Sequence, residues 1–238
     1  MATIKMTTLI LPAVSTANIP QLSVDLIVST LHLQYEQSLD DLGTVYPFTS
    51  PSDYHPAVAL STAIQVFSRP DLGITCLQQR SPTLPGSKTK FIEDVLLPFI
   101  RAGNFSRIIL LSSSDAARRL DVRGSRSVLL NDQDLLGLMK SLQISEPHTS
   151  SVTRSRLPGS GVTVPLLCAL AGLYDKTTLQ CLVRYAFDGD NFEDAHQLAK
   201  DVLEILGASD TSVLSEPKSW KGVYGKPVKV GIEHGLYG

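Results

Sequence analysis

The sequence has little cysteine and no long apolar run. Three of its 238 residues are cysteines, and none belongs to a CxxC pair. This argues against a disulfide framework and is typical of a reducing compartment. No stretch approaches the 18 apolar residues of a membrane-spanning helix, and Pro12 interrupts an apolar run at 8–14 that is too short for a signal peptide. We therefore expect a soluble intracellular protein with no membrane partner.

A large excess of either charge is also missing. The chain has 21 Lys and Arg against 23 Asp and Glu, a net charge of −2, so overall charge does not hold it to nucleic acid. The charge is nevertheless uneven, because residues 80–130 hold nine basic and four acidic residues. This segment forms either a solvated face or a local basic patch. Hydrophobic residues make up 43% of the chain, which is enough for a core and excludes wholesale disorder.

What the sequence does have is an alternation of strand and helix patterns. Strands are predicted at 7–11, 63–67, 74–79, 107–111, 127–130 and 178–187. Helices are predicted to start near residue 18 and to cover 88–102, 132–142, 162–174 and 191–206. The run 107–111 is continuously apolar, as in a strand covered on both faces. The alternation predicts an α/β protein, and a hairpin over 63–79 makes its sheet mixed.

The first predicted helix begins with residues that are typical of a helix N-terminus. Residues 34–58, in contrast, show almost no pattern of a helix or a strand. Asn18 is a good N-cap, Pro20 suits the first turn, and Gln21 stands where a capping box places its amide. The stretch 34–58 is rich in Asp, Ser, Tyr and Pro, with at most a short strand at 44–46.

Two loops are candidates for an anion site or a nucleophile. Ser112–Ser114 follow a buried strand, where ligands of α/β sheets bind, but no GxSxG surrounds them. The interpretation we favour is turn and capping residues. The glycine turn at 157–161 lacks the Lys and the spacing of a P-loop. It is better explained as a packing turn before a helix, with an anion-binding nest as the alternative.

The sequence does not offer a convincing metal or catalytic set. The five histidines are scattered without HxxxH or HExxH spacing, which argues against zinc. Asp188, Asp190, Glu193 and Asp194 lie at the start of a predicted helix, where acids favour the helix dipole. A weak cation site is the alternative for these acids. We therefore expect neither a metal nor a cofactor.

Several blocks, taken together, resemble the proteasome assembly chaperone 2 family. They occur in the family's order at 11–31 (LPAVS…N…QL…DLI…STL), 107–114 (RIILLSSS), 157–163 (LPGSGVT), 189–191 (GDN) and 219–220 (SW). Ala17 and Pro20 stand where glycine is expected around Asn18, and Ser160 replaces a glycine. These departures affect local backbone geometry. The stretch 34–58 matches poorly.

The resemblance implies a fold and a non-enzymatic role. The fold is a three-layer α/β/α arrangement with a mixed sheet, similar to the phosphorylase/hydrolase class. The implied partners are proteasome assembly chaperone 1, in a heterodimer, and the α subunits of the 20S proteasome. The heterodimer scaffolds α-ring formation and prevents α-ring dimers, in the cytoplasm and nucleus. We expect one domain over 1–216 and a flexible tail over 217–238.

The chain ends in Leu236-Tyr237-Gly238, which resembles the hydrophobic–Tyr–any motif of proteasome activators and assembly chaperones. The terminal carboxylate of Gly238 would pair with a lysine in a pocket between α subunits. Tyr237 would supply a rigid aromatic body and Leu236 an apolar anchor. Four lysines in 217–238 serve either solubility or steering toward an acidic surface.

The alternative to a chaperone is a small-molecule phosphorylase/hydrolase-like enzyme. This alternative rests on the fold class and on the loops 112–115 and 157–161.

Overall fold

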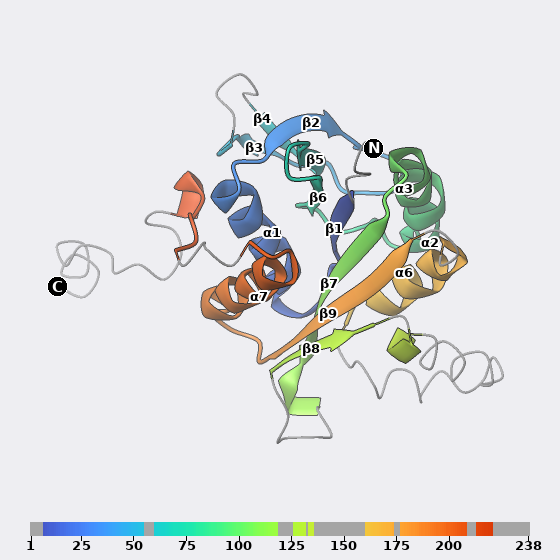
Figure 1. The fold of residues 1–238 in the computed structure, drawn as a ribbon. Helices are drawn as coiled ribbons and strands as arrows, with labels where there is room; N and C mark the ends of the chain where they lie inside the picture. The colour runs from blue at the N-terminus through green and yellow to red at the C-terminus, as the bar shows by residue number, and fades with distance from the viewer. Residues whose placement is uncertain are drawn as a thin grey trace, which may run out of the picture.

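A seven-stranded mixed sheet forms the centre of the molecule (Figure 1). The structure is a computed structural model that describes residues 7–54, 60–118, 126–131, 133–135, 160–173, 177–208 and 213–220. In spatial order the strands are β2 (Gln34–Ser38), β5 (Ile64–Arg69), β6 (Ile74–Gln79), β1 (Thr8–Pro12), β7 (Arg107–Asp115), β9 (Thr178–Ala186) and β8 (Ser127–Leu130). A separate pair is formed by β3 (Thr49–Pro51) and β4 (Leu60–Thr62).

The four middle strands of the sheet are parallel, and the strands outside them are antiparallel. β1 pairs in parallel with both β6 and β7, and β7 pairs in parallel with β9 over nine residues. β5 and β6 form the predicted antiparallel hairpin, β2 adds to β5, and β8 adds to β9. The mixed sheet is thus confirmed. β1 and β7 lie at its centre, where apolar residues are needed on both faces.

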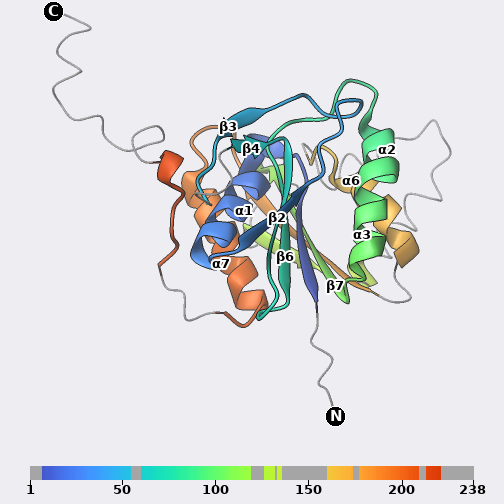
Figure 2. The same ribbon diagram turned by 90° about the horizontal axis from the view of Figure 1, so that it is seen from above.

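Helices cover both faces of the sheet, which confirms the three-layer α/β/α prediction. Figure 2 shows α1 and α7 on one side and α2, α3 and α6 on the other. The helices are α1 (Ile19–Thr30), α2 (Lys88–Lys90), α3 (Leu97–Gly103), α6 (Thr163–Leu170) and α7 (Phe192–Ile205). Short 3₁₀ turns lie at Thr16–Asn18, Ala116–Arg118, Ala171–Leu173 and Lys218–Trp220. None of the helices in the described ranges has the length and apolar character that crossing a bilayer requires.

Alternate residues of the central strands point into two separate cores. Leu9, Leu11, Ile108 and Leu110 belong to the core under α3 and α6. The core under α1 and α7 takes the intervening side chains, among them Ile10, Ile109 and Leu111. All are at most 1% exposed. At about 1.5–3 kcal/mol for each fully buried apolar side chain, these seven residues contribute on the order of 10–20 kcal/mol of hydrophobic stabilisation.

Most predicted elements are confirmed, and the differences have local causes. The predicted helix at 88–102 is continuous, but residues Phe91–Leu96 between α2 and α3 are π-helical. Pro98 has no N–H to donate to the carbonyl four residues earlier, which disfavours regular α geometry there. β2 was missed because it is a polar, exposed edge strand. At 44–46 there is one isolated bridge, from Val45 to Thr83, in place of a strand.

Two further predictions are wrong or fall outside the described residues. Ser112–Ser114 are part of β7 and are not turn residues after it, because the strand extends to Asp115 alongside β9. Most of the predicted helix at 132–142, and residues 157–159 of the glycine turn, lie outside the described residues.

The start of α1 is at the predicted place, with a different geometry. Asn18 occupies the N-cap position, but its side chain makes no capping hydrogen bond and its φ is +53°. Ala17 before it has φ +56°. Two successive non-glycine residues are therefore in the left-handed region, at a cost of about 1–2 kcal/mol each. This explains in physical terms why glycine is expected beside Asn18.

We predict that Ala17→Gly stabilises the protein by about 0.5–1 kcal/mol, because glycine removes the Cβ strain but adds unfolded-state entropy. The control is Ala102→Gly on the exposed surface of α3, which should cost about 0.5–1 kcal/mol. Urea unfolding of the wild type and the two variants measures both changes in the free energy of unfolding. Destabilisation by Ala17→Gly would show that this turn is not strained.

Candidate functional site

The carboxyl edge, where β1, β6 and β7 end, holds the polar groups that the sequence placed after buried strands. Ser113 donates its N–H to Ser15 Oγ at 3.0 Å, and the two hydroxyls are 2.9 Å apart. The hydroxyl of Ser113 also donates to the carbonyl of Thr16. These bonds fasten the loop after β1 onto β7. Since Ser112–Ser114 are 0% exposed, they do not present a nucleophile to solvent.

The start of α6 is fastened to the same edge. Ser112 Oγ lies 2.7 Å from Thr163 Oγ1, which donates to the carbonyl of Ser160 at 2.6 Å. Val162 donates its N–H to the carbonyl of Val14 at 3.1 Å. A Cβ on Gly161 would lie 1.9 Å from that same carbonyl oxygen, and its φ is +57°. In its described part the glycine turn is therefore the predicted packing turn before a helix.

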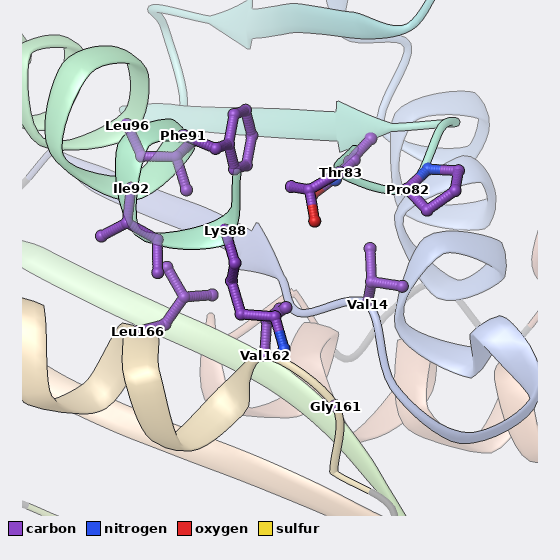
Figure 3. Close-up of a pocket in the computed structure, with 11 residues that line it drawn as sticks. Val14, Pro82, Thr83, Lys88, Phe91, Ile92, Leu96, Gly161, Val162 and Leu166 are labelled. Atoms are coloured by element: carbon purple, nitrogen blue, oxygen red, sulfur yellow. The ribbon is translucent and has the colours of Figure 1, made fainter. Parts of the chain in front are cut away.

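An apolar pocket of about 210 Å³ lies beside this turn (Figure 3). Phe91, Ile92 and Leu96 form one side of it, and Leu166 comes from α6 (Figure 3). Val14 and Pro82 lie across from the helix residues (Figure 3). Lys88 is the one charged residue among the described residues that line it. The pocket has room for an apolar side chain, and its described lining residues do not form a set of groups for chemistry.

A larger cavity of about 780 Å³ adjoins this pocket and is called the polar cavity below. The two share Val14, Gln79 and Pro82. The described residues that line the polar cavity are Val14, Asn18, Gln21, Leu22, Asp25, Phe48, Ser50, Pro51, Asp53, Gln78, Gln79, Arg80, Ser81, Pro82, Lys218, Ser219 and Trp220. They come from α1, β3, the end of β6 and the 3₁₀ turn at Lys218–Trp220. Its volume is within the range of ligand pockets.

A buried ion pair forms one wall of the polar cavity. Asp25 accepts hydrogen bonds from Arg80 Nη2 at 2.9 Å and from Gln78 Nε2 at 2.6 Å, and also from the hydroxyl of Tyr54. Burial raises the pKa of Tyr54 well above its usual value, and the charge of Asp25 adds to this. Burial alone would lower the pKa of Arg80, but Asp25 and Tyr54 outweigh it and raise that pKa. Arg80 therefore stays charged and Tyr54 neutral near pH 7, so neither exchanges protons there.

The segment 214–220 packs on α1 and α7, and its residues 218–220 line the polar cavity. Asp53 accepts the N–H of Ser219 at 2.9 Å and its hydroxyl at 2.6 Å. Trp220 is 5% exposed and packs edge-on against Phe192, with ring centres 4.9 Å apart. His196 Nε2 lies 3.4 Å from a carboxylate oxygen of Glu216. Residues 217–220, predicted as the start of a flexible tail, thus pack on the body of the protein.

The other candidate residues have structural roles. Asp194, from the acidic cluster, pairs with Arg184 at 2.8 Å. In the described part of the chain, no group of three His, Cys, Asp or Glu side chains is placed to hold a metal ion. Burial raises the pKa of Cys181 to about 12 and raises that of Cys76 further, so both remain protonated thiols.

The predicted contact residues Leu236, Tyr237 and Gly238 lie outside the described residues. What sequence reasoning missed is the polar cavity. A signal was present: Asp25 lies among the apolar residues of α1, and Gln78 and Gln79 end an otherwise alternating strand. Polar residues at core positions point to a buried network or a site.

Fold and site together define an α/β/α protein with two adjoining cavities at the carboxyl edge of its sheet. The model of the PAC2 family matches residues 9–210, and the chain belongs to that family. Proteasome assembly chaperone 2 of Danio rerio is 29% identical, covering 93% of this chain and 92% of the relative. The Homo sapiens protein of that name is 28% identical over 92% and 91%.

Solved structures support the fold. PbaA of Pyrococcus furiosus, described as an archaeal homolog of proteasome-assembly chaperone, superposes with a TM-score of 0.58 at 12% identity. The match covers 85% of this chain and 82% of PbaA. A protein of unknown function from Thermoplasma acidophilum gives a TM-score of 0.57 at 14% identity, over 86% and 76% of the two chains.

We predict that Gly161→Ala lowers the free energy of unfolding by about 3 kcal/mol, because the left-handed backbone strain is joined by a clash with the Val14 carbonyl. Gly86→Ala is the matched control, since its φ is +77° and a Cβ there meets nothing within 4 Å. The control should lose about 1–2 kcal/mol. Urea unfolding measures the free energy of unfolding of both variants. Equal losses in the two variants would contradict the close approach of Gly161 to the Val14 carbonyl.

We predict that Asp25→Asn destabilises the protein by about 3 kcal/mol, because it leaves the Arg80 charge buried without its partner. The control is Asp71→Asn, which breaks an exposed pair with Arg69 and should change stability by less than about 1 kcal/mol. Thermal or urea unfolding provides the measurement. A loss at Asp25 no larger than at Asp71 would rule out a buried pair.

Proposed function

We propose that this protein is a chaperone for assembly of the 20S proteasome. The observation that carries the proposal is membership of the PAC2 family together with relatives named proteasome assembly chaperone 2, which align over about nine-tenths of both chains. Alignment over that length includes the whole α/β/α body. The likeness to PbaA in fold is consistent with this.

In this proposal the protein forms a heterodimer with proteasome assembly chaperone 1 and binds the α subunits as the ring forms. It scaffolds the ring, prevents α-ring dimers, and works in the cytoplasm and nucleus. Leu236, Tyr237 and Gly238 dock in a pocket between neighbouring α subunits, with the terminal carboxylate paired to a lysine. Eighteen residues follow Trp220, the last described residue, and the motif is the last three of them.

The proposed role is a non-enzymatic one. The enzyme alternative arose from the serines after β7's apolar run and from the glycine turn. The hydroxyls of Ser112 and Ser113 are engaged in bonds that join β7 to its neighbours, and Gly161 packs against the Val14 carbonyl. The described parts of both loops thus serve packing, which favours a binding protein over a hydrolase or phosphorylase.

The proposal predicts that a chain ending at Gly235 loses α-ring binding while its fold and heterodimer are retained. Losing a charge-assisted contact and an aromatic anchor should weaken binding about 10–100-fold. Tagged pull-down with mass spectrometry, followed by titration against purified α subunits, measures both partners. A full-length chain with residues 236–238 replaced by three serines controls for chain length.

Three outcomes separate the claims. Loss of α subunits alone, in both the truncated and the serine variants, supports docking by the tail. Retention of α subunits in both variants contradicts the docking role but leaves the chaperone role. Absence of both partners from the full-length pull-down contradicts the proposed function.

A further inference from the structure

We propose that the polar cavity binds an uncharged, extended peptide segment of a partner protein. The cavity lies between α1, β3, the end of β6 and the 3₁₀ turn at Lys218–Trp220. It is separate from the C-terminal motif of the proposed function, and the inference rests on the geometry of the cavity alone.

The first observation is a concentration of unpartnered polar atoms in the cavity wall. Both amide atoms of Gln21, the amide oxygen of Gln78 and Nε of Arg80 are buried without a hydrogen-bond partner. These four are among seven such side-chain atoms in the described residues. Gln21 is 9% exposed and Gln78 is 1% exposed. Because buried polar groups are nearly always bonded, such a cluster is a place where a bound group can complete the hydrogen bonds.

The chemistry of these atoms matches a peptide backbone. The amide of Gln21 offers a donor and an acceptor side by side. In an extended chain, the N–H and C=O of one residue point to the same side and present the complementary pair. The amide oxygen of Gln78 and Nε of Arg80 also lack a hydrogen-bond partner, but both atoms are fully buried as they are placed. A side-chain rotation of the kind common on binding would turn the Gln21 amide fully into the cavity.

The charges that line the cavity favour a neutral ligand. Asp25 is paired with Arg80, and Asp53 accepts two hydrogen bonds from Ser219. Lys218 is exposed and is the remaining cation among the described residues that line the cavity. A phosphate or nucleotide would need several uncompensated cations, which the described part of this wall does not supply.

The remaining walls suit an extended chain. Phe48, Pro51, Pro82 and Trp220 supply aromatic and proline surfaces of the kind that grip extended peptides. β3 borders the cavity through Ser50 and Pro51, and within the described residues β4 pairs with one of its edges. An open strand edge is a template for a further strand, which a peptide can supply and a sugar cannot.

The experiment uses Trp220 as the reporter, because it is the single tryptophan of the chain and lines the cavity. Random twelve-residue peptides displayed in a library are selected on the full-length protein. Enriched sequences are synthesised with capped ends and titrated by Trp220 fluorescence. Gln21→Met is the test variant, since it keeps the volume and removes the amide. Gln65→Met is the control, because Gln65 also has an unpartnered buried oxygen but lies in β5 and does not line the cavity.

We expect enriched peptides to be uncharged and to bind with a saturable fluorescence change. Gln21→Met should weaken them about tenfold, whereas Gln65→Met should not. Without peptide, Gln21→Met should raise the melting temperature by about 3 °C, because an unpartnered buried amide destabilises the free protein. Higher stability together with lost binding is a combination that a purely structural glutamine would not give.

Other results overturn the proposal. A lower melting temperature for Gln21→Met would mean that ordered water already satisfies its amide. Peptides that bind the wild type and Gln21→Met equally would place the site elsewhere. A saturable fluorescence change with maltotriose, lost in Gln21→Met and unaccompanied by peptide enrichment, would make the cavity a sugar site.

Discussion

The parallel pairing of β1 with β7 is the constraint on which the rest of this structure depends. Both strands are covered on both faces, so their side chains must supply two cores at once. The pairing also places the residues that follow β1 next to the second half of β7. Ser15 then reaches Ser113, and the carbonyl of Val14 becomes the point where the start of α6 is fastened. The geometry of the carboxyl edge thus follows from the register of two apolar strands.

At the same edge, some buried polar groups have all their hydrogen bonds and others do not. Ser112 and Ser113 are buried but engaged, and they rigidify the junction between β1, β7 and α6. Asp25 and Arg80 form a bonded pair, yet Gln21 and Gln78 beside them leave amide atoms unpaired. Unpaired buried atoms lower stability, and four of the seven in the described residues belong to side chains that line the polar cavity. A stable junction next to an incomplete polar wall is an arrangement suited to recognition.

The described side chains that could take part in catalysis have structural roles instead. The buried thiols are held protonated, the serines of β7 are used for packing, and the acidic residue Asp194 is paired with Arg184. A chaperone for proteasome assembly needs surfaces that hold partners in place and release them, and it does not need a nucleophile. The segment 214–220 is hydrogen-bonded to Asp53 and packs edge-on against Phe192, and it joins the body of the protein to the last eighteen residues of the sequence.

Residue patterns were sufficient to predict the α/β class, the mixed sheet, the hairpin and the buried strand at 107–111, because periodicity follows local burial and turn residues mark the ends of elements. Blocks such as LPAVS and RIILLSSS predicted the family, and residue 17 was identified as a glycine-like position. The assignment of Ser112–Ser114 to a strand required the three-dimensional structure, since their burial depends on β9 beside them. Likewise the pairing of Asp25 with Arg80, and the cavity lined by Gln21 and Trp220, join residues up to about 200 positions apart. Local patterns carry no information about such contacts, because these contacts form only when the sheet brings the ends of separate strands to one edge.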